Sequence, residues 1–324
     1  MINVTDLPVD IEEMRLWASG YREEHDLSWA KFAEQLDGIP AGTLQPFCKG
    51  NYQGKNDRIA RTIYKFRQTL QAVGARQITI PQDPGFFRTE TSDAIKAMMI
   101  VAHMGRITMV GTGPGTGKTK MAREYAASAD PVWIATMRES TRRIGPMVQT
   151  VQAAVGVPGR SAYTWTSAAS KLVADQMRGK RGLLIIDEAN NLDLQSLEEI
   201  RSWHDETGVG VCLLGNEELV ATIESGRRSH AFARLNSRIA QRLVQNLPRE
   251  ADIDAFCDAW GLTDPGIRKL LQQVAMMQGS GGLRECRQIV EAASMLAADA
   301  GKSIDLNDFK DAKALRAQRL VRAI

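Results

Sequence analysis

The residues best suited to do chemistry lie in the stretch VGTGPGTGKTKMAREY, residues 110–125. Backbone N–H groups of a glycine-rich turn, together with the start of a helix, can surround phosphate oxygens. Lys118 would reach the β- and γ-phosphates of a nucleotide, and the Thr119 hydroxyl would bind Mg²⁺. The stretch therefore predicts a nucleotide site. Its predicted cofactor-binding residues are Gly113, Pro114, Gly115, Thr116, Gly117, Lys118, Thr119 and Lys120.

One position departs from the usual phosphate-loop pattern. That pattern has a glycine five residues before Gly117, where this chain has Thr112. The context still fits, because an apolar run (107–110) precedes the loop and a helical pattern (118–128) follows it. The missing glycine falls at the exit of the expected strand, so we expect the phosphate cradle to form.

Two acids follow the buried run LLII at residues 183–186. Ligands of an open α/β sheet lie at the carboxyl ends of its strands, and Asp187 and Glu188 stand at such an end. We expect Asp187 to hold Mg²⁺ and Glu188 to activate the attacking water. Asn216 ends another apolar run, VCLLGN, and would help to position that water.

Arginines further along the chain could stabilise the charge on a transferring phosphoryl group, often from a neighbouring subunit. Arg234, Arg238 and Arg242 lie in AFARLNSRIAQR, and their i, i+4 spacing puts all three on one face of a helix. The alternative is a basic face that binds DNA or solvent. In GSGGLRECR, Arg284 opens a helix and could sense the γ-phosphate, with Arg287 as the second choice.

The elements that must position these residues follow from the pattern of apolar runs. Continuous apolar runs separated by helical stretches predict a parallel sheet covered on both faces. After about residue 247 the pattern is helical only. We predict an N-terminal domain (1–75), a linker (76–92), an α/β ATPase core with a parallel sheet (93–247) and a C-terminal helical lid domain (248–324).

The N-terminal domain is predicted to be all-α and to contain a helix-turn-helix. Leu27 or Ser28 can cap a first helix, Gly38 and Pro40 break it, and a second short helix covers residues 41–48. In such motifs the second helix enters the major groove, and Thr43, Gln45 and Lys49 would be its exposed DNA-contacting residues. A protein-docking or structural role is the alternative.

Composition and charge limit the class of protein. The 324-residue chain is 24% charged, has a net charge of +3 and has no apolar run near the roughly 20 residues of a membrane span. We expect a cytoplasmic protein that does not contact a membrane. Residues 38–75 hold six Lys/Arg against one acid, residues 134–182 eight against two, and residues 225–249 six against none. Three basic blocks favour a polyanion partner. The four scattered cysteines favour reduced thiols.

The ordered set TGPGTGKT, LLIIDEAN, LLGN, ARLNSRIAQR and GGLR resembles the AAA+ ATPases. With DEAN…LEEIR and FARLNSRIA, the chain is similar more specifically to the transposition protein B family of phage Mu and related transposable phages. GTLQPFCKGNYQGKNDRI is similar to the second and third helices of that family's N-terminal helix-turn-helix domain.

The resemblance implies an ATP-dependent, largely sequence-nonspecific DNA-binding ATPase. Such proteins form homo-oligomers, which are helical filaments on double-stranded target DNA. They deliver this DNA to a DDE transposase, and the transposase stimulates their hydrolysis of ATP. By analogy with related ring and filament ATPases, a first basic set that follows the second core strand would face DNA: Arg138, Arg142 and Arg143. A second basic set comprises Lys171, Arg178, Lys180 and Arg181.

Two other functions stay open on the sequence. A helicase loader or replication initiator would depend on a helicase rather than on a transposase. A sequence-specific regulator with a nucleotide-sensing domain would bind a single operator through its N-terminal domain. The presence of Lys118, Asp187 and Glu188 argues against a domain that senses nucleotide without hydrolysing it.

Overall fold

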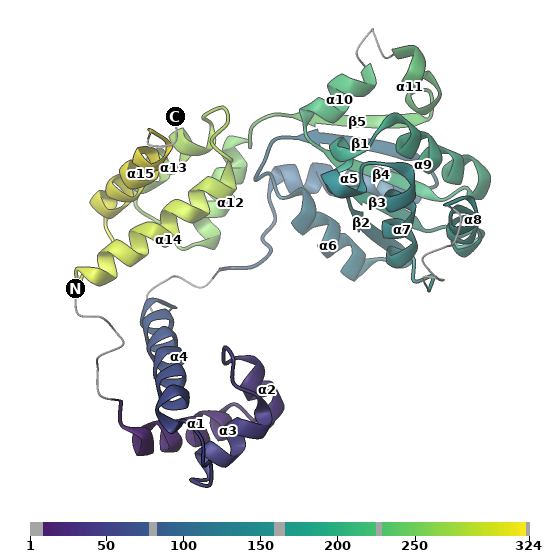
Figure 1. The fold of residues 1–324 in the computed structure, drawn as a ribbon. Helices are drawn as coiled ribbons and strands as arrows, with labels where there is room; N and C mark the ends of the chain where they lie inside the picture. The colour runs from purple at the N-terminus through teal and green to yellow at the C-terminus, as the bar shows by residue number, and fades with distance from the viewer. Residues whose placement is uncertain (1–8, 78–82, 159–165, 225–228, 322–324) are drawn as a thin grey trace. The chain divides into compact units, whose positions relative to one another are not determined.

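The chain divides into two compact units, Met1–Ile80 and Pro81–Ile324. The computed structural model describes residues 9–77, 83–158, 166–224 and 229–321 (Figure 1). The two units have separate hydrophobic cores. Each unit is therefore described by itself.

The first unit is all-α, with α1 (Ile11–Glu24), α2 (Trp29–Glu34), α3 (Ala41–Cys48) and α4 (Asn56–Gln77). The two short helices expected from the sequence are α2 and α3, and Ser28 caps α2 by accepting a hydrogen bond from the Lys31 N–H at 3.2 Å. Helix α1 is not expected from the pattern, because it is highly charged and buries only Met14 and Ala18. Its packing against the other helices stabilises it.

The second unit contains a parallel sheet whose strands run in the order β2-β3-β4-β1-β5. These strands are β1 (Ile107–Thr112), β2 (Val132–Thr136), β3 (Leu183–Asp187), β4 (Gly210–Gly215) and β5 (Ile239–Gln245). Every residue of β1, β3 and β4 is buried, which is why these strands form continuous apolar runs. The prediction of an α/β fold with a parallel sheet is confirmed.

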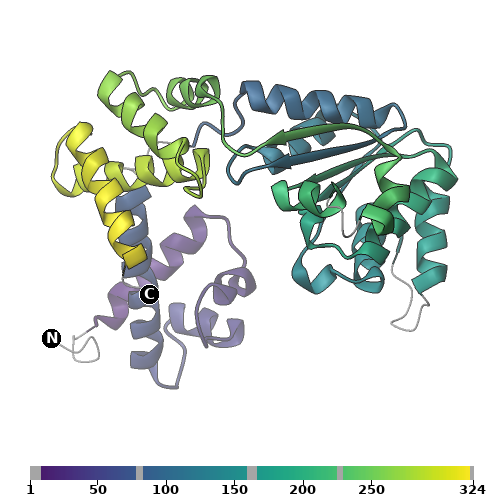
Figure 2. The same cartoon turned by 90° about the horizontal axis from the view of Figure 1, so that it is seen from above.

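Helices cover both faces of this sheet (Figure 2). One face carries α5 (Glu90–His103) and α6 (Lys118–Ser128). The core on the other face includes α7 (Ile144–Ala154), α8 (Thr166–Met177), α9 (Leu194–Thr207), α10 (Glu217–Glu224) and α11 (Ser229–Asn236). Neighbouring strand residues alternate between the two cores: Val110 belongs to the first and Met109 to the second.

The C-terminal part is helical, as expected, with α12 (Glu250–Ala259), α13 (Pro265–Ala275), α14 (Leu283–Asp299) and α15 (Leu306–Val321). It has its own apolar cluster and is called the lid below. Buried Asp252 joins the lid to the sheet region, since its carboxylate accepts from the Thr91 N–H at 2.8 Å and the Thr91 hydroxyl at 2.5 Å. Gln245, at the end of β5, donates to the same hydroxyl at 2.7 Å.

The prediction that Arg234, Arg238 and Arg242 share a helical face is wrong. Helix α11 ends at Asn236, and residues 239–245 form β5, which pairs with β1. This strand lies at the sheet edge, and Ile239 is its only fully buried residue. It therefore lacks the apolar run that reveals the other four strands, and its exposed residues Gln241 and Arg242 resemble the polar face of a helix.

All four cysteines are free. Burial raises the pKa of the Cys212 and Cys286 thiols to about 12, and that of the Cys48 and Cys257 thiols to about 11. The thiols are therefore protonated at neutral pH and are poor nucleophiles. In the described ranges, none of the helices has the length and apolar character needed to cross a bilayer.

The tight contact between β4 and α5 generates a stability prediction. A Cβ at Gly210 would lie 2.0 Å from the Ala102 carbonyl oxygen and 2.7 Å from its carbonyl carbon. These are backbone atoms of buried Ala102 in the last turn of α5, so they cannot move away without displacing the helix. We expect Gly210→Ala to lower the free energy of unfolding by at least about 2 kcal/mol. Chemical denaturation followed by circular dichroism measures the change.

Gly145→Ala is the matched control. Gly145 lies inside α7, has no positive φ, and a Cβ there would meet only the Thr166 hydroxyl at 3.5 Å. Because alanine favours helix over glycine by up to about 1 kcal/mol, this variant should be at least as stable as the wild type. Equal losses of stability in the two variants would contradict the proposed clash.

Candidate functional site

The phosphate loop connects β1 to α6, and its glycines have the backbone geometry that the motif requires. Gly115 and Gly117 have φ of 76° and 91°, values that favour glycine. Gly117 precedes the first residue of α6, and no side chain caps this helix. The first N–H groups of α6 have no intrahelical partner, so they are available to phosphate oxygens.

Thr112 replaces the usual first glycine without distorting the loop. It is the last residue of β1 and pairs with Gln245 of β5, so its backbone is extended and needs no glycine. Its buried hydroxyl lies 2.7 Å from the Thr116 hydroxyl, which in turn donates to the Gly113 carbonyl at 3.0 Å. Because Thr116 donates to that carbonyl, Thr112 donates to Thr116. The substitution therefore adds a hydrogen bond across the base of the loop.

Lys118 folds back under the loop. Its ammonium donates to the carbonyl oxygens of Thr112 at 2.5 Å and Gly113 at 3.0 Å. Burial is the largest influence on the pKa of Lys118 and lowers it below the ordinary value, while the nearby carboxylates of Glu188 and Asp187 act in the opposite direction. A phosphate group would supply a stronger acceptor at the same position.

Thr119 and Asp187, the two residues predicted to bind Mg²⁺, are in contact. The Thr119 hydroxyl donates to Asp187 Oδ2 at 2.8 Å, although the residues are far apart in sequence. Parallel pairing produces this contact: β3 pairs with β4 and β4 with β1, so the carboxyl ends of β1 and β3 lie at one edge. A hydroxyl and a carboxylate at the phosphate end of a nucleotide site form a donor set that suits Mg²⁺.

Glu188 follows Asp187 and is exposed at the rim of the site. Its backbone is left-handed, with φ of 56° and ψ of 39°, and its N–H donates to Asp187 Oδ1 at 3.1 Å. This conformation is strained for a residue other than glycine, and such strain is common at functional sites. The short 3-10 helix η3 (Ala189–Asn191) begins directly after it.

Asn216 lies at the end of the neighbouring strand, β4. Its side chain accepts from the Leu219 N–H at 3.3 Å and donates to Glu218 at 3.3 Å, which fixes the start of α10. Glu188 and Asn216 line the same cavity, which has a volume of about 420 Å³. The phosphate-loop residues 114–120 line it too, so three separate sequence motifs meet there.

The other side of this cavity is aromatic, and the sequence analysis missed it. Phe86, Phe87, Phe256 and Trp260 line it. Phe87 and Phe256 meet edge to face, with ring centroids 6.0 Å apart, and Phe256 lies 5.7 Å from Trp260. An apolar, aromatic wall next to a phosphate cradle suits the base of a nucleotide.

Part of this wall comes from the segment predicted as a linker. Phe86 and Phe87 precede Thr89, which caps α5 through a reciprocal pair of hydrogen bonds with Ser92. The only signal in the sequence is two adjacent phenylalanines in a stretch rich in proline and polar residues. Lys120 bonds to this segment as well, donating to the Gly85 carbonyl at 3.0 Å.

The lid contributes the third side of the cavity through Leu283, Arg284 and Arg287. Arg284 is exposed, and its side chain has no polar partner among the described residues, so it is available to a ligand. Arg287 is engaged, with contacts to Asp83 at 2.8 Å and Glu291 at 2.7 Å. The geometry therefore favours Arg284 over Arg287 as a contact for phosphate.

The lid also touches the phosphate loop directly. A Cβ at Gly115 would lie 2.0 Å from the Gly281 carbonyl oxygen, and one at Gly282 would lie 2.9 Å from the Pro114 carbonyl oxygen. Glycines on both sides permit this close approach of two backbones.

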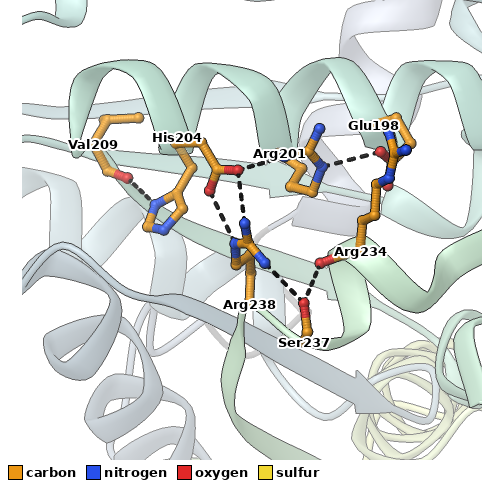
Figure 3. A network of polar contacts seen from close by, with 8 residues as sticks. Glu198, Arg201, His204, Val209, Arg234, Ser237 and Arg238 are labelled. Carbon is orange, nitrogen blue, oxygen red and sulfur yellow. Dashed lines mark hydrogen bonds and ion pairs between the residues drawn. The ribbon is translucent and has the colours of Figure 1, made fainter.

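Arg234 and Arg238 lie away from the cavity. Arg238 precedes β5, so it lies at the amino ends of the strands. The phosphate loop follows β1 and therefore lies at their carboxyl ends. A seven-residue strand spans about 20 Å, so about this distance separates Arg238 from the phosphate-loop end of the sheet. Figure 3 shows Arg238 in a polar network with Arg201 and Ser237. Arg242 lies within β5, opposite Met109, and pairs with Glu224 at 3.0 Å.

The two basic sets also lie at opposite ends of the strands. The first set follows β2, at the carboxyl end of that strand, and lies on both sides of the 3-10 helix η2 (Glu139–Thr141). All three of its residues are exposed: Arg138, Arg142 and Arg143. Three residues of the second set precede β3, at the amino end of that strand: Arg178, Lys180 and Arg181. Within the second set, Arg178 is paired with Glu206 at 2.6 Å.

In the first unit, the three predicted DNA-contacting residues lie on or directly after α3. Lys49 is exposed, while Thr43 and Gln45 are half-buried. Leu44 and Phe47 of the same helix belong to the core. The DNA contacts themselves stay a prediction.

Two family models match the chain. Residues 103–223 match an AAA domain, and residues 237–315 match the family described as Mu B transposition protein, C terminal. The "ATP-dependent target DNA activator B" of Escherichia phage Mu is 30% identical over 305 residues, 94% of this chain and 95% of that protein. The "Mu-like prophage FluMu DNA transposition protein B" of Haemophilus influenzae is 32% identical over 264 residues, 81% of this chain and 89% of that protein.

Solved structures show the same fold at low sequence identity. The Cdc6p protein of Pyrobaculum aerophilum superposes with a TM-score of 0.55 at 13% identity, covering 73% of this chain and 69% of that chain. The ORC1 protein of Aeropyrum pernix, solved in complex with DNA, gives a TM-score of 0.55 at 15% identity, covering 77% and 72%. The fold is that of the AAA+ P-loop ATPases, as predicted from the sequence.

The hydrogen bond from Thr112 to Thr116 generates a prediction about nucleotide binding. Thr112→Val keeps the shape of the side chain but removes the donor. A typical hydrogen bond contributes about 1 kcal/mol, so a looser loop should weaken ATP binding about fivefold. Titration with a fluorescent ATP analogue measures the change. Thr112→Ser, which keeps the hydroxyl, should bind as the wild type does, and unchanged affinity in Thr112→Val would contradict this role of Thr112.

Proposed function

The chain belongs to the Mu B transposition protein family, and from this premise we propose that it is an ATP-hydrolysing, DNA-binding protein that assembles on target DNA and delivers it to a DDE transposase. The observation that carries the proposal is the single cavity in which the phosphate loop, Glu188, Asn216 and Arg284 meet. The coarser conclusion, membership of an ATP-dependent AAA+ family, rests on the matches themselves.

The chemistry we propose is hydrolysis of ATP in this cavity. The base would lie against Phe87, Phe256 and Trp260, and the phosphates would lie over the open end of α6. Lys118 would exchange its two carbonyl acceptors for phosphate oxygens. Each of these interactions orients the nucleotide and keeps its terminal phosphate near the acidic rim.

Glu188 is the proposed base. It is exposed at the rim of the cavity, and both oxygens of the adjacent Asp187 already accept hydrogen bonds. Asp187 is the proposed ligand of Mg²⁺, which leaves Glu188 to take a proton from water. Asn216, held by its bonds to α10, would orient the same water.

Thr119 and Asp187 would hold Mg²⁺, because their oxygens already lie 2.8 Å apart beside the phosphate loop. A bound Mg²⁺ would neutralise negative charge on the phosphate oxygens. To bind it, the Thr119 hydroxyl would turn its proton away from Asp187 and present a lone pair instead.

Arg238 is the proposed source of positive charge for the nucleotide of a neighbouring subunit. It lies at the amino ends of the strands, while its own phosphate loop lies at their carboxyl ends, so it cannot serve its own site. Arg234 is exposed on α11 nearby and is the second choice. An arginine supplied in trans makes hydrolysis a property of an assembly, which accords with the helical filament that we propose.

The first basic set is the proposed DNA contact. Its segment is bonded to the nucleotide site: the Met137 N–H donates to the Asp187 carbonyl at 2.8 Å, and Asn191 donates to the Met137 carbonyl at 3.2 Å. The Arg142 carbonyl also accepts from the Ser196 hydroxyl at 2.9 Å. These bonds would connect a bound nucleotide to the DNA-binding segment.

Contacts of this kind bind the phosphate backbone and carry no sequence information, so we propose binding to double-stranded DNA without sequence choice. As part of the same function we propose a DDE transposase as the partner and the host cytoplasm as the place of action. The curated relative is named a target DNA activator, and we propose the same role for this chain.

Binding to random-sequence duplex DNA with ATP, with ADP and without nucleotide, over a salt series, tests the proposal. We expect tight, cooperative binding with ATP only, falling steeply with salt. Binding to one site irrespective of nucleotide would overturn it in favour of a sequence-specific regulator.

Glu188→Gln separates ATP binding from hydrolysis. The amide keeps the size of the side chain but accepts no proton, so we expect ATP affinity close to that of the wild type and hydrolysis on the order of 100-fold slower. DNA complexes formed with ATP should persist. Release of phosphate and dissociation from DNA measure these effects, and hydrolysis at the wild-type rate would refute the assignment of Glu188 as the base.

Removing charge from the first basic set should weaken binding to every DNA sequence alike. For Arg138→Ala/Arg143→Ala we expect the slope of log affinity against log salt to fall by about 2. Lys171→Ala/Lys180→Ala removes the same charge from the second basic set and should leave the slope close to that of the wild type. The reverse pattern would assign the DNA contact to the second set.

A further inference from the structure

Arg238 is not free: it is held by Asp205, a residue that the sequence analysis did not single out. The Arg238 Nε donates to Asp205 Oδ1 at 3.2 Å and the Nη2 donates to Oδ2 at 3.3 Å. The two parallel bonds fix the plane of the guanidinium, as is typical of paired arginine and carboxylate groups. Its Nη1 donates to the Ser237 hydroxyl at 3.0 Å.

Asp205 is itself anchored. It lies in the last turn of α9, where Arg201, one turn earlier, donates to Asp205 Oδ2. Arg201 also pairs with Glu198 at 3.0 Å, and its side chain is only 15% exposed. The result is a chain of charges, Glu198–Arg201–Asp205–Arg238, of which Figure 3 labels Glu198, Arg201 and Arg238.

The other side of Arg238 is held by the turn that leads into β5. The Ser237 hydroxyl, which accepts from Arg238, donates to the Arg234 carbonyl at 2.8 Å. Arginine has five N–H donors, and three of them are used by Asp205 and Ser237. The two that remain, one on each terminal nitrogen, have no partner among the described residues, and the side chain is 45% exposed.

We propose that Asp205 is a positioning residue for hydrolysis in a neighbouring subunit: it holds Arg238 with its two free donors directed outward. This inference rests on the proposed function, and in particular on the role of Arg238 in trans. A long arginine on the surface samples many conformations, and fixing it beforehand removes that entropic cost from the reaction. Asp205 lies in the last turn of α9, which precedes β4, so it lies on the same side of the sheet as Arg238 and away from its own nucleotide cavity. In the proposed role it acts through Arg238.

The test compares ATP hydrolysis at saturating DNA for Asp205→Asn and for its matched control Glu206→Gln. Glu206 is the next residue of α9, carries the same charge and pairs with Arg178 instead. We expect Asp205→Asn to reduce kcat about 10- to 100-fold, with the KM for ATP unchanged, because its own pocket is intact. Glu206→Gln should hydrolyse at the wild-type rate.

Mixed assemblies distinguish positioning from a structural role. A Glu188→Gln subunit hydrolyses ATP on the order of 100-fold more slowly, but its Arg238 is held normally and can serve the intact site of an Asp205→Asn neighbour. We expect an equal mixture of the two variants to recover about a quarter of the wild-type rate, since half of the sites and half of the arginines are competent. A damaged fold in Asp205→Asn would not be rescued.

Arg238→Ala separates the failure of this inference from the failure of the proposed function. If Arg238→Ala loses activity on the order of 10³-fold while Asp205→Asn is unaffected, Arg238 acts in trans without Asp205, and the inference alone is overturned. If Arg238→Ala hydrolyses normally, the trans arginine is overturned, and the inference with it. In the double variant Asp205→Asn/Arg238→Ala, a rate equal to that of Arg238→Ala supports positioning, and a further loss overturns it.

Discussion

The nucleotide cavity depends on the parallel pairing of β3, β4 and β1. This pairing puts Thr112, Asp187 and Gly215 at the carboxyl ends of neighbouring strands, so residues that are distant in sequence meet there. The contact between Thr119 and Asp187 is its direct product. A slip of one residue in β3 would turn Asp187 to the other face of the sheet. The complete burial of all three strands opposes such a slip, because it would expose or crowd their apolar side chains.

The cavity combines two kinds of surface that come from different parts of the second unit. The polar side belongs to the sheet and the phosphate loop, and its residues are held by backbone geometry and short hydrogen bonds. The aromatic side comes from the segment before α5 and from α12 of the lid. Asp252 fixes the lid to the start of α5, next to Phe87 and Thr89. The aromatic side of the cavity and the position of the lid are therefore linked through the same residues.

The sequence allows much of this site to be predicted, because phosphate binding requires particular residue types at fixed spacing. The phosphate loop, Asp187, Glu188, Asn216 and the helix at 118–128 are all recognisable locally. The aromatic wall is not, since Phe87, Phe256 and Trp260 meet only through tertiary packing and have no spacing in common. Strand β5 escapes prediction for a different reason: it borders the sheet on one side only, so it needs few apolar residues.

Arg238 and the phosphate loop lie at opposite ends of the strands, and this has a consequence for any head-to-tail array of these chains. Each interface would join one chain's arginine to the next chain's nucleotide. The last nucleotide at one end then lacks an arginine, and the last arginine at the other end lacks a nucleotide. With Arg238 acting in trans as proposed, such an array would have chemically distinct ends. ATP would survive longest at one terminus, which would give growth and loss of subunits a direction set by the fold of a single chain.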